Sequence, residues 1–169
     1  GTFIGIDRER CIFMRSYSSR GPGEFVSIGN PTNPSFQAGM GMSKIKIDGG
    51  STTNGPAISI FSAVRSRFEE CHFAGGSIAC NIDFNITNTF ATCIFSDSII
   101  GVKIVNSNLL HFEGGEIVDN TQIGMWVSGN RMISVSNVDV EGNGTTLGAQ
   151  EQGGIYIGPN MGQDVAIND

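Results

Sequence analysis

The residues Ile58-Ser59-Ile60 begin a pattern, two apolar residues around one other residue, that returns along the chain. The later copies are Cys80-Asn81-Ile82, Val102-Lys103-Ile104, Met125-Trp126-Val127 and Ile155-Tyr156-Ile157, at steps of 22, 22, 23 and 30 residues. A second apolar pattern stays in phase with it, at steps of 22, 22 and 23 residues: Phe68-x-x-Cys71-x-Phe73, Phe90-x-x-Cys93-x-Phe95, Phe112-x-x-Gly115-x-Ile117 and Val135-x-x-Val138-x-Val140. Two apolar patterns that share one period indicate a repeat architecture.

The spacing inside each repeat predicts strands. Apolar residues alternate with polar ones, which is the period of a strand with one buried face. Gly, Asn, Asp and Ser fill the segments between these strands, as turns require. No segment shows the apolar stripe of a helix, so we expect almost no helix. We therefore predict an all-β fold, a single-stranded right-handed parallel β-helix with coils of about 22 residues and two strands in each coil.

The chain divides by the regularity of this repeat. We expect one β-helix domain over residues 1–169, with irregular first coils at 1–40 and regular coils at 41–143. A loop insertion at 144–152 and a last partial coil at 153–169 follow. The chain begins in strand-like residues and stops within a coil, so we expect it to be a piece of a longer protein.

Composition limits the classes of partner. The formal charge of −6 and the pI of about 4.8 argue against nucleic acid and anionic membranes as partners. No apolar run is long enough to span a bilayer, so no membrane insertion is expected. The four cysteines form no Cys-x-x-Cys pair, and Cys71 and Cys93 fall on the inward phase of adjacent coils. We expect buried thiols that fill the core, and neither a metal nor a cofactor.

Three segments carry a resemblance to a known family: Ile45-Lys46-Ile47-Asp48-Gly49-Gly50, Asn54-Gly55-Pro56-Ala57-Ile58-Ser59-Ile60 and Phe68-Glu69-Glu70-Cys71-His72-Phe73. They resemble the pectate-lyase-like β-helices, and bacteriophage tailspike depolymerases in particular, over about residues 40–169. The resemblance implies an extracellular homotrimeric spike on a virion tail that binds and cleaves a bacterial capsular or O-antigen polysaccharide, as a hydrolase or a lyase. The N-terminal Gly-Asp-Gly-x-x-Asp-Asp-Thr segment of the family is absent, and no catalytic motif carries over. Glycan binding without cleavage and a purely structural role in a spike or fibre therefore stay open as alternatives.

The first candidate site follows from the outward column of the first pattern. Stacking the coils places these residues above one another: Ser27, Ser59, Asn81, Lys103, Trp126 and Tyr156. Trp126 and Tyr156 offer neighbouring aromatic surfaces beside Lys103, which suits contact with sugar rings. The loop insertion flanks them and is expected to wall a groove. An interface between chains is the alternative use of the same rings.

The second candidate site lies on the outward column of the other pattern: Lys46, His72, Ile94, Glu116 and Asp139. Glu116 and Asp139 should lie one coil apart, where repulsion raises the pKa of one carboxyl, as a general acid requires. Their spacing favours a retaining glycosidase over an inverting one. Asp97 and Asp119 form a second pair at a corner, and His72 is a candidate substrate contact or lyase base. A solvated acidic face is the alternative reading of both pairs.

Two polar columns at the turns are predicted to be structural. They are Asn85, Ser107 and Asn130 at one turn, and Ser98, Asn120 and Asn143 at another. Such side chains form hydrogen-bond ladders along a solenoid.

Overall fold

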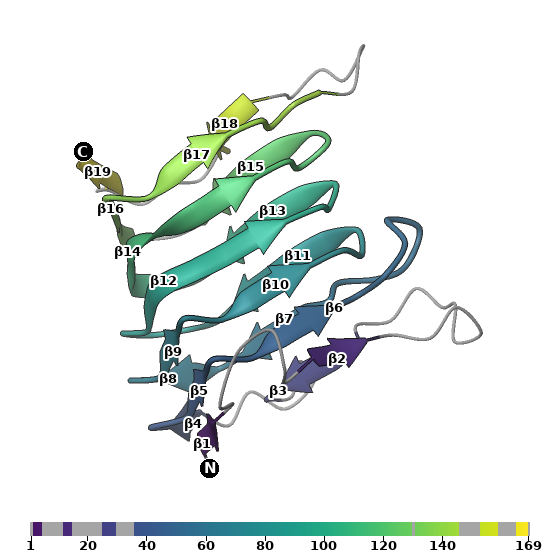
Figure 1. Cartoon of the computed structure of the whole chain (residues 1–169). Coiled ribbons are helices and arrows are strands. Elements are labelled where there is room, and N and C mark those ends of the chain that lie inside the picture. The colour runs from purple at the N-terminus through teal and green to yellow at the C-terminus, as the bar shows by residue number, and fades with distance from the viewer. Residues whose placement is uncertain are drawn as a thin grey trace.

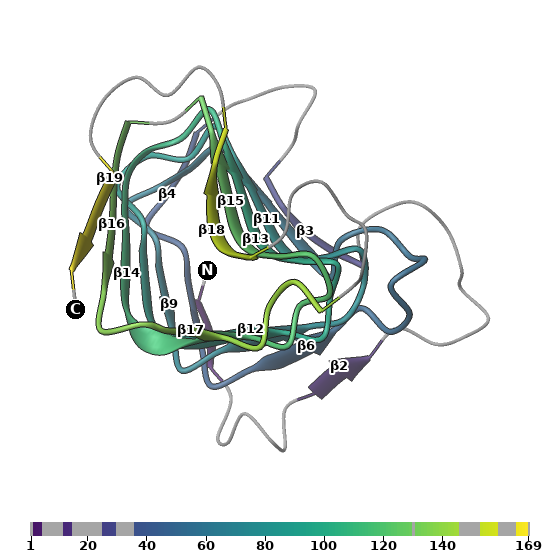
Figure 2. The same ribbon diagram turned by 90° about the horizontal axis from the view of Figure 1, so that it is seen from above.

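The structure is a computed structural model that describes residues 2–4, 12–14, 25–29, 36–129, 131–145, 153–158 and 165–168. Within these ranges all the named elements are strands, β1 to β19, and none is a helix (Figure 1). The named strands pair in parallel and stack as the coils of a solenoid. Seen from the C-terminal end, the chain passes counter-clockwise through β15, β16, β17 and β18 as it rises toward the viewer (Figure 2). The predicted right-handed parallel β-helix is confirmed.

The first apolar pattern forms a sheet of six strands, called the six-stranded sheet below. Its members are β3 (Val26–Ile28), β7 (Ile58–Phe61), β11 (Ile78–Asp83), β13 (Ile100–Val105), β15 (Ile123–Ser128) and β18 (Gly153–Ile157). Their register is the predicted one, because Ile58, Cys80, Val102, Met125 and Ile155 are successive partners. Alternate residues of these strands therefore point to the core and to the outside.

The second pattern forms an eleven-stranded sheet that bends. Its members are β1 (Thr2–Ile4), β2 (Ile12–Met14), β5 (Gly41–Ser43), β6 (Lys46–Asp48), β9 (Arg67–Glu69), β10 (His72–Ala74), β12 (Thr89–Ser96), β14 (Asn108–Val118), β16 (Arg131–Ser136), β17 (Asp139–Glu141) and β19 (Val165–Asn168). The separate strands β9 and β10 both pair with β12, so one long strand covers two faces. A regular coil thus has three faces (Figure 2). The coils of β11–β12 and β13–β14 have the two strands that were predicted, whereas the coil of β15, β16 and β17 has three. β4 (Gln37–Ala38) and β8 (Ala63–Val64) make a short extra pair.

The bend is made by one residue with a positive φ in each coil. Glu70, Thr92, Gly114 and Asn137 occupy equivalent places, with φ of 50°, 51°, 64° and 53°. This left-handed conformation breaks the strand alternation, so that residues three apart, such as Phe68 and Cys71, both point inward. Such a conformation costs about 1–2 kcal/mol for a residue other than glycine. The packing on both sides of the bend has to offset that cost.

Aromatic rings fill the core along the solenoid axis. Phe90 lies between Phe68 and Phe112, with ring centroids 4.8 Å and 4.9 Å apart and interplanar angles of 10° and 7°. Phe73 and Phe95 form a second stack at 5.6 Å. These five rings are at most 2% exposed, so they bury large apolar surfaces.

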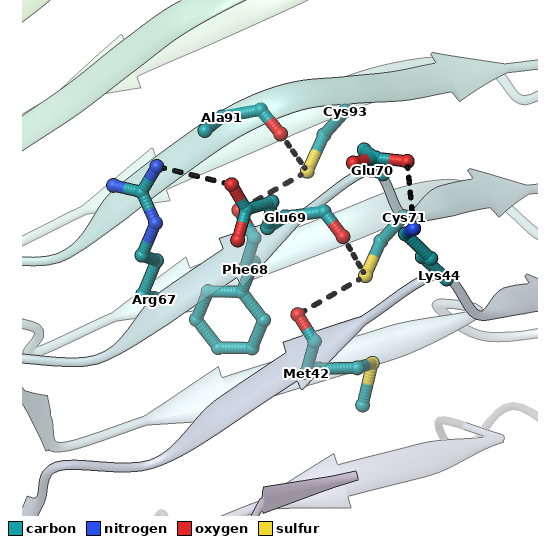
Figure 3. Close-up of polar contacts among 9 residues, drawn as sticks. All are labelled: Met42, Lys44, Arg67, Phe68, Glu69, Glu70, Cys71, Ala91 and Cys93. Atoms are coloured by element: carbon teal, nitrogen blue, oxygen red, sulfur yellow. Dashed lines mark hydrogen bonds and ion pairs between the residues drawn. The ribbon is translucent and has the colours of Figure 1, made fainter. Parts of the chain in front are cut away.

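The described cysteines are buried free thiols, as predicted. The Cys71 thiol donates to the carbonyls of Met42 and Glu69, both at 3.4 Å (Figure 3). The Cys93 thiol does the same with Phe68 and Ala91 at 3.5 Å. Burial raises the pKa of Cys80 well above its ordinary value, which keeps that thiol protonated. Cys11 lies outside the described residues.

The predicted polar ladders are present where the structure describes them. The Ser98 amide donates to Asn120 Oδ1 at 3.2 Å, and the Asn120 amide donates to Asn143 Oδ1 at 3.1 Å. At the other turn the Asn85 amide donates to Ser107 Oγ at 3.1 Å, while Asn130 lies outside the described residues. Asn85 and Asn120 are fully buried. Their side chains satisfy backbone groups that the turns leave without ladder partners.

One corner absorbs an extra residue. Ser98 and Asn120 are 22 residues apart, whereas their neighbours Ile100 and Ile123 are 23 apart and are still strand partners. The added residue fits because the amides of Gln122 and Ile123 both donate to the Ile99 carbonyl, at 3.0 Å and 3.2 Å. The corner forms a bulge and the register beyond it is kept.

The structure describes only part of the segments that were predicted to be irregular. Most of residues 1–40 and of the insertion at 144–152 lie outside the described ranges, so those boundaries stay predictions. The described residues contain no helix that is long and apolar enough to cross a membrane.

Candidate functional site

The aromatic candidates occupy one outward column of the six-stranded sheet. Lys103 on β13, Trp126 on β15 and Tyr156 on β18 are successive partners in the register. The three residues are half-buried. The structure therefore brings together all three residues that were predicted from the column.

Their side chains touch as well as stack. The Lys103 ammonium lies 4.7 Å from the centroid of the Trp126 ring, within the range of a cation–π contact. On the other side, the Trp126 and Tyr156 centroids are 6.1 Å apart at 72°, an edge-to-face arrangement. The indole is thus held between a cation and a second ring. Its orientation is set before any ligand arrives.

The indole N–H is an unusual feature of this column. Trp126 Nε1 is buried and has no hydrogen-bond partner among the described residues. A Cβ at Gly158 would lie 3.2 Å from this nitrogen, so the glycine lets the indole lie close to the backbone. An unpaired buried donor costs about 1–3 kcal/mol, which an acceptor from outside the described residues would recover.

Asp83 belongs to the same surface, although it was not predicted. It follows Asn81, the register partner of Lys103, by two residues on β11, so it points outward on the neighbouring coil. Burial raises the pKa of the Asp83 carboxyl, against the opposing effects of the Asn106 amide, the Phe84 backbone N–H and the Lys103 charge. The Asn106 side chain donates to Asp83 Oδ1 at 3.3 Å. The outward phase of the Cys80-Asn81-Ile82-Asp83 segment was the sequence signal that pointed to it.

Of the other candidates, one pair lies on the eleven-stranded sheet and one pair lies at a corner directly after its strands. Glu116 on β14 and Asp139 on β17 are direct register partners, and both are exposed. Asp97 and Asp119 are exposed corner residues in adjacent coils, each with a φ of 57°. Both carboxylate pairs therefore have the neighbouring-coil placement that was expected. Glu116 and Asp139 lie on a different face from the Lys103–Trp126–Tyr156 column, because β14 and β17 belong to the other sheet (Figure 2).

A hydrogen-bonded chain joins two of these candidates through a residue that was missed. His72 Nε2 lies 2.9 Å from Ser96 Oγ, and Ser96 Oγ donates to Asp97 Oδ2 at 2.6 Å. Because the serine proton is directed at Asp97, this geometry makes the histidine nitrogen the donor to Ser96. Ser96 is 4% exposed, so the imidazole and the carboxylate are linked through a buried hydroxyl. Such a chain can orient a histidine for proton transfer.

One open hollow of about 310 Å³ lies apart from both groups. It is lined by residues of β5 and β9 and of the segments before them: Gly39, Met40, Gly41, Met42, Ser43, Arg65, Arg67 and Glu69. Arg67 and Glu69 already form an ion pair there at 3.3 Å. The described ranges contain no group of three His, Cys, Asp or Glu side chains placed as metal ligands.

No protein-family model matches this chain, and no curated protein matches its sequence.

Proposed function

We propose that this chain binds a bacterial surface polysaccharide, capsule or O-antigen, on the outward face of the six-stranded sheet, as part of a phage tailspike. The observation that carries the proposal is the contact of Lys103, Trp126 and Tyr156 across three coils. Half-buried aromatic rings with polar edges suit the mixed apolar and polar surface of sugars. A solenoid also presents successive coils as one elongated surface, which suits a long polymer.

The pre-set geometry supports binding over a purely structural use. An indole already held by a cation and a ring loses little conformational freedom when a ligand docks.

The test uses Trp126 as its own reporter, because it is the only tryptophan of the chain. Capsule or lipopolysaccharide titrated into the protein should change the Trp126 fluorescence. Tyr156→Ala should weaken binding by about 1–3 kcal/mol, from the contact area of a large side chain. Trp126→Ala, followed by calorimetry, should weaken binding per folded chain by a similar amount, and it should also lower the thermal midpoint because the contacts with Lys103 and Tyr156 are lost.

Phe84→Ala is the matched control, since Phe84 is an aromatic residue 51% exposed and outside the column. It should leave affinity unchanged. If Trp126→Ala instead dissociates an oligomer and leaves binding per folded chain intact, the ring belongs to an interface and the proposal fails.

Cleavage of the same polysaccharide is the second function we propose. The register pairing of Glu116 with Asp139 favours it, because neighbouring strands lie about 4.8 Å apart and retaining glycosidases hold their carboxyl groups about 5–5.5 Å apart. The His72–Ser96–Asp97 chain offers a base for a lyase instead. New reducing ends would indicate cleavage, and an ultraviolet-absorbing unsaturated product would indicate the lyase.

A homotrimer is part of the proposal. It rests on the resemblance to tailspikes, which implies a homotrimeric spike. Sedimentation at micromolar concentration should show trimers, and a monomer alone would contradict this expectation.

A further inference from the structure

We infer that the surface around Lys103 selects acidic polysaccharides, whose sugars carry carboxylates, over neutral ones. This inference rests on the proposed function, because it names the substrate class of the same column. Among the residues of the six strands, Lys103 is the only lysine or arginine, and Asp83 is the only carboxylate. Lys103 is therefore the one cation on a face whose only other charged residue is Asp83, and it is the group that attracts a negative charge on a ligand.

The positive charge of Lys103 is held in place but not neutralised. Its ammonium lies over the Trp126 ring at 4.7 Å. In the part of the chain that the structure describes, ion pairs closer than 4.0 Å join Lys44 to Glu70 and Arg67 to Glu69, and none involves Lys103. A lysine side chain normally loses much of its rotamer freedom when it is fixed. Here the ring has already restricted it, so a ligand carboxylate gains a charge-assisted hydrogen bond at lower cost.

Asp83 should lower the affinity of this surface for an acidic ligand. It attracts Lys103 from the neighbouring coil without a contact ion pair, and a ligand carboxylate competes with it for the same ammonium. It also repels that carboxylate directly. Removal of the Asp83 charge should therefore strengthen the binding of acidic polymers and leave neutral ones unaffected.

The neighbouring aromatic rings explain why a sugar carboxylate fits better than a small anion. Trp126 and Tyr156 flank the ammonium on the side of the later coils, where they offer apolar contact to the ring that bears the carboxylate. A small anion would interact with the Lys103 charge and would gain no contact with the two rings.

The experiment compares polymers that differ only in charge. The probes are polygalacturonate, alginate and hyaluronan, each beside its carboxyl-reduced form, with Trp126 fluorescence as the readout. At least one acidic polymer should bind at least about tenfold tighter than its reduced form. Lys103→Met keeps the packing on Trp126 and should weaken acidic binding by about 10–100-fold, the equivalent of a hydrogen bond to a charged group. It should change neutral binding by less than about twofold.

Lys44→Met is the control, because Lys44 is an exposed lysine at the other sheet, and it should leave both affinities unchanged. Asp83→Asn should raise the affinity for the acidic polymer alone. Equal binding of a polymer and its reduced form, or equal loss of both in Lys103→Met, overturns the inference while the proposed function stands. Failure of all six polymers overturns the inference, and failure of the host capsule and lipopolysaccharide as well removes the proposed function.

Discussion

Gly115 lies so close to Cys93 of the preceding coil that a Cβ at position 115 would come within 2.1 Å of the Cys93 carbonyl oxygen. Its neighbour Gly114 also has a positive φ, but a Cβ there would meet nothing nearer than the Asn137 carbonyl oxygen at 3.8 Å. Two adjacent glycines therefore serve different physical needs. Gly114 supplies a backbone conformation, and Gly115 supplies room between stacked coils.

These two roles predict unequal costs for the same substitution. Gly114→Ala should cost about 1–2 kcal/mol, from the strain of a left-handed residue alone. Gly115→Ala should cost more than about 4 kcal/mol, because the coils must separate to admit the methyl group. Urea unfolding of the two variants measures the difference. Equal costs would show that conformation, and not the approach to Cys93, is what position 115 requires.

Substitution of Asn120 should destabilise the fold more than substitution of any other polar residue of the ladder. Its side chain accepts from the Ser98 amide and donates to the carbonyls of Phe95 and Val118, all without exposure to water. Asn120→Ala leaves these groups unpaired and should cost on the order of 3 kcal/mol, or about 6–12 °C in the thermal midpoint. Asn81→Ala, on an outward position of β11, should stay within about 0.5 kcal/mol.

If the protein cleaves its polysaccharide through the acid pair, Glu116→Gln and Asp139→Asn should each lower turnover by about 10²-fold or more, with folding unchanged. Glu113→Gln is the control, because Glu113 is an exposed glutamate on the same strand outside the pair. Release of reducing ends is the measurement. Full activity in both variants would move the catalytic group to Asp97 and Asp119, or to the His72–Ser96–Asp97 chain.

Asp83 predicts a pH-dependent stability. Its folded pKa is raised by burial above the ordinary value of 3.8, so the native state takes up a proton before the unfolded chain does. Stability contributed by this group therefore falls as the pH rises through the folded pKa. Asp83→Asn should be more stable than the wild type at neutral pH, and the gap should close below the unfolded pKa. Thermal melts across that range test it, with the exposed Glu141→Gln as the control.

The columns were predictable because the 22-residue period sets the register of every later strand. Lys103, Trp126 and Tyr156, and also Glu116 and Asp139, are partners for that reason. The third face was missed because no common residue type marks the bend: Glu70 and Thr92 disfavour the left-handed conformation that they adopt, whereas Gly114 and Asn137 favour it.

Contacts between side chains of different columns could not be read from the period. Ser96 links His72 to Asp97 across two coils and a corner, which depends on rotamers and not on register. The period places Asp83 on the outward phase, but its partial burial and the influence of the Lys103 charge, which single it out, do not follow from the period. Periodicity determines which residues are neighbours, while packing determines which neighbours bond.

The bulge at Gln122 and Ile123 has a consequence for how such a chain changes length. A shift of one residue inside a strand would turn every later side chain to the opposite face. At this corner the Ile99 carbonyl accepts from two successive amides instead, and Trp126 and Tyr156 keep their places above Lys103. One added residue is therefore accommodated at this corner, whereas the same addition inside a strand would disrupt the register. A lineage of such proteins can vary its turns one residue at a time while its sheets change only by whole circuits of about 22 residues.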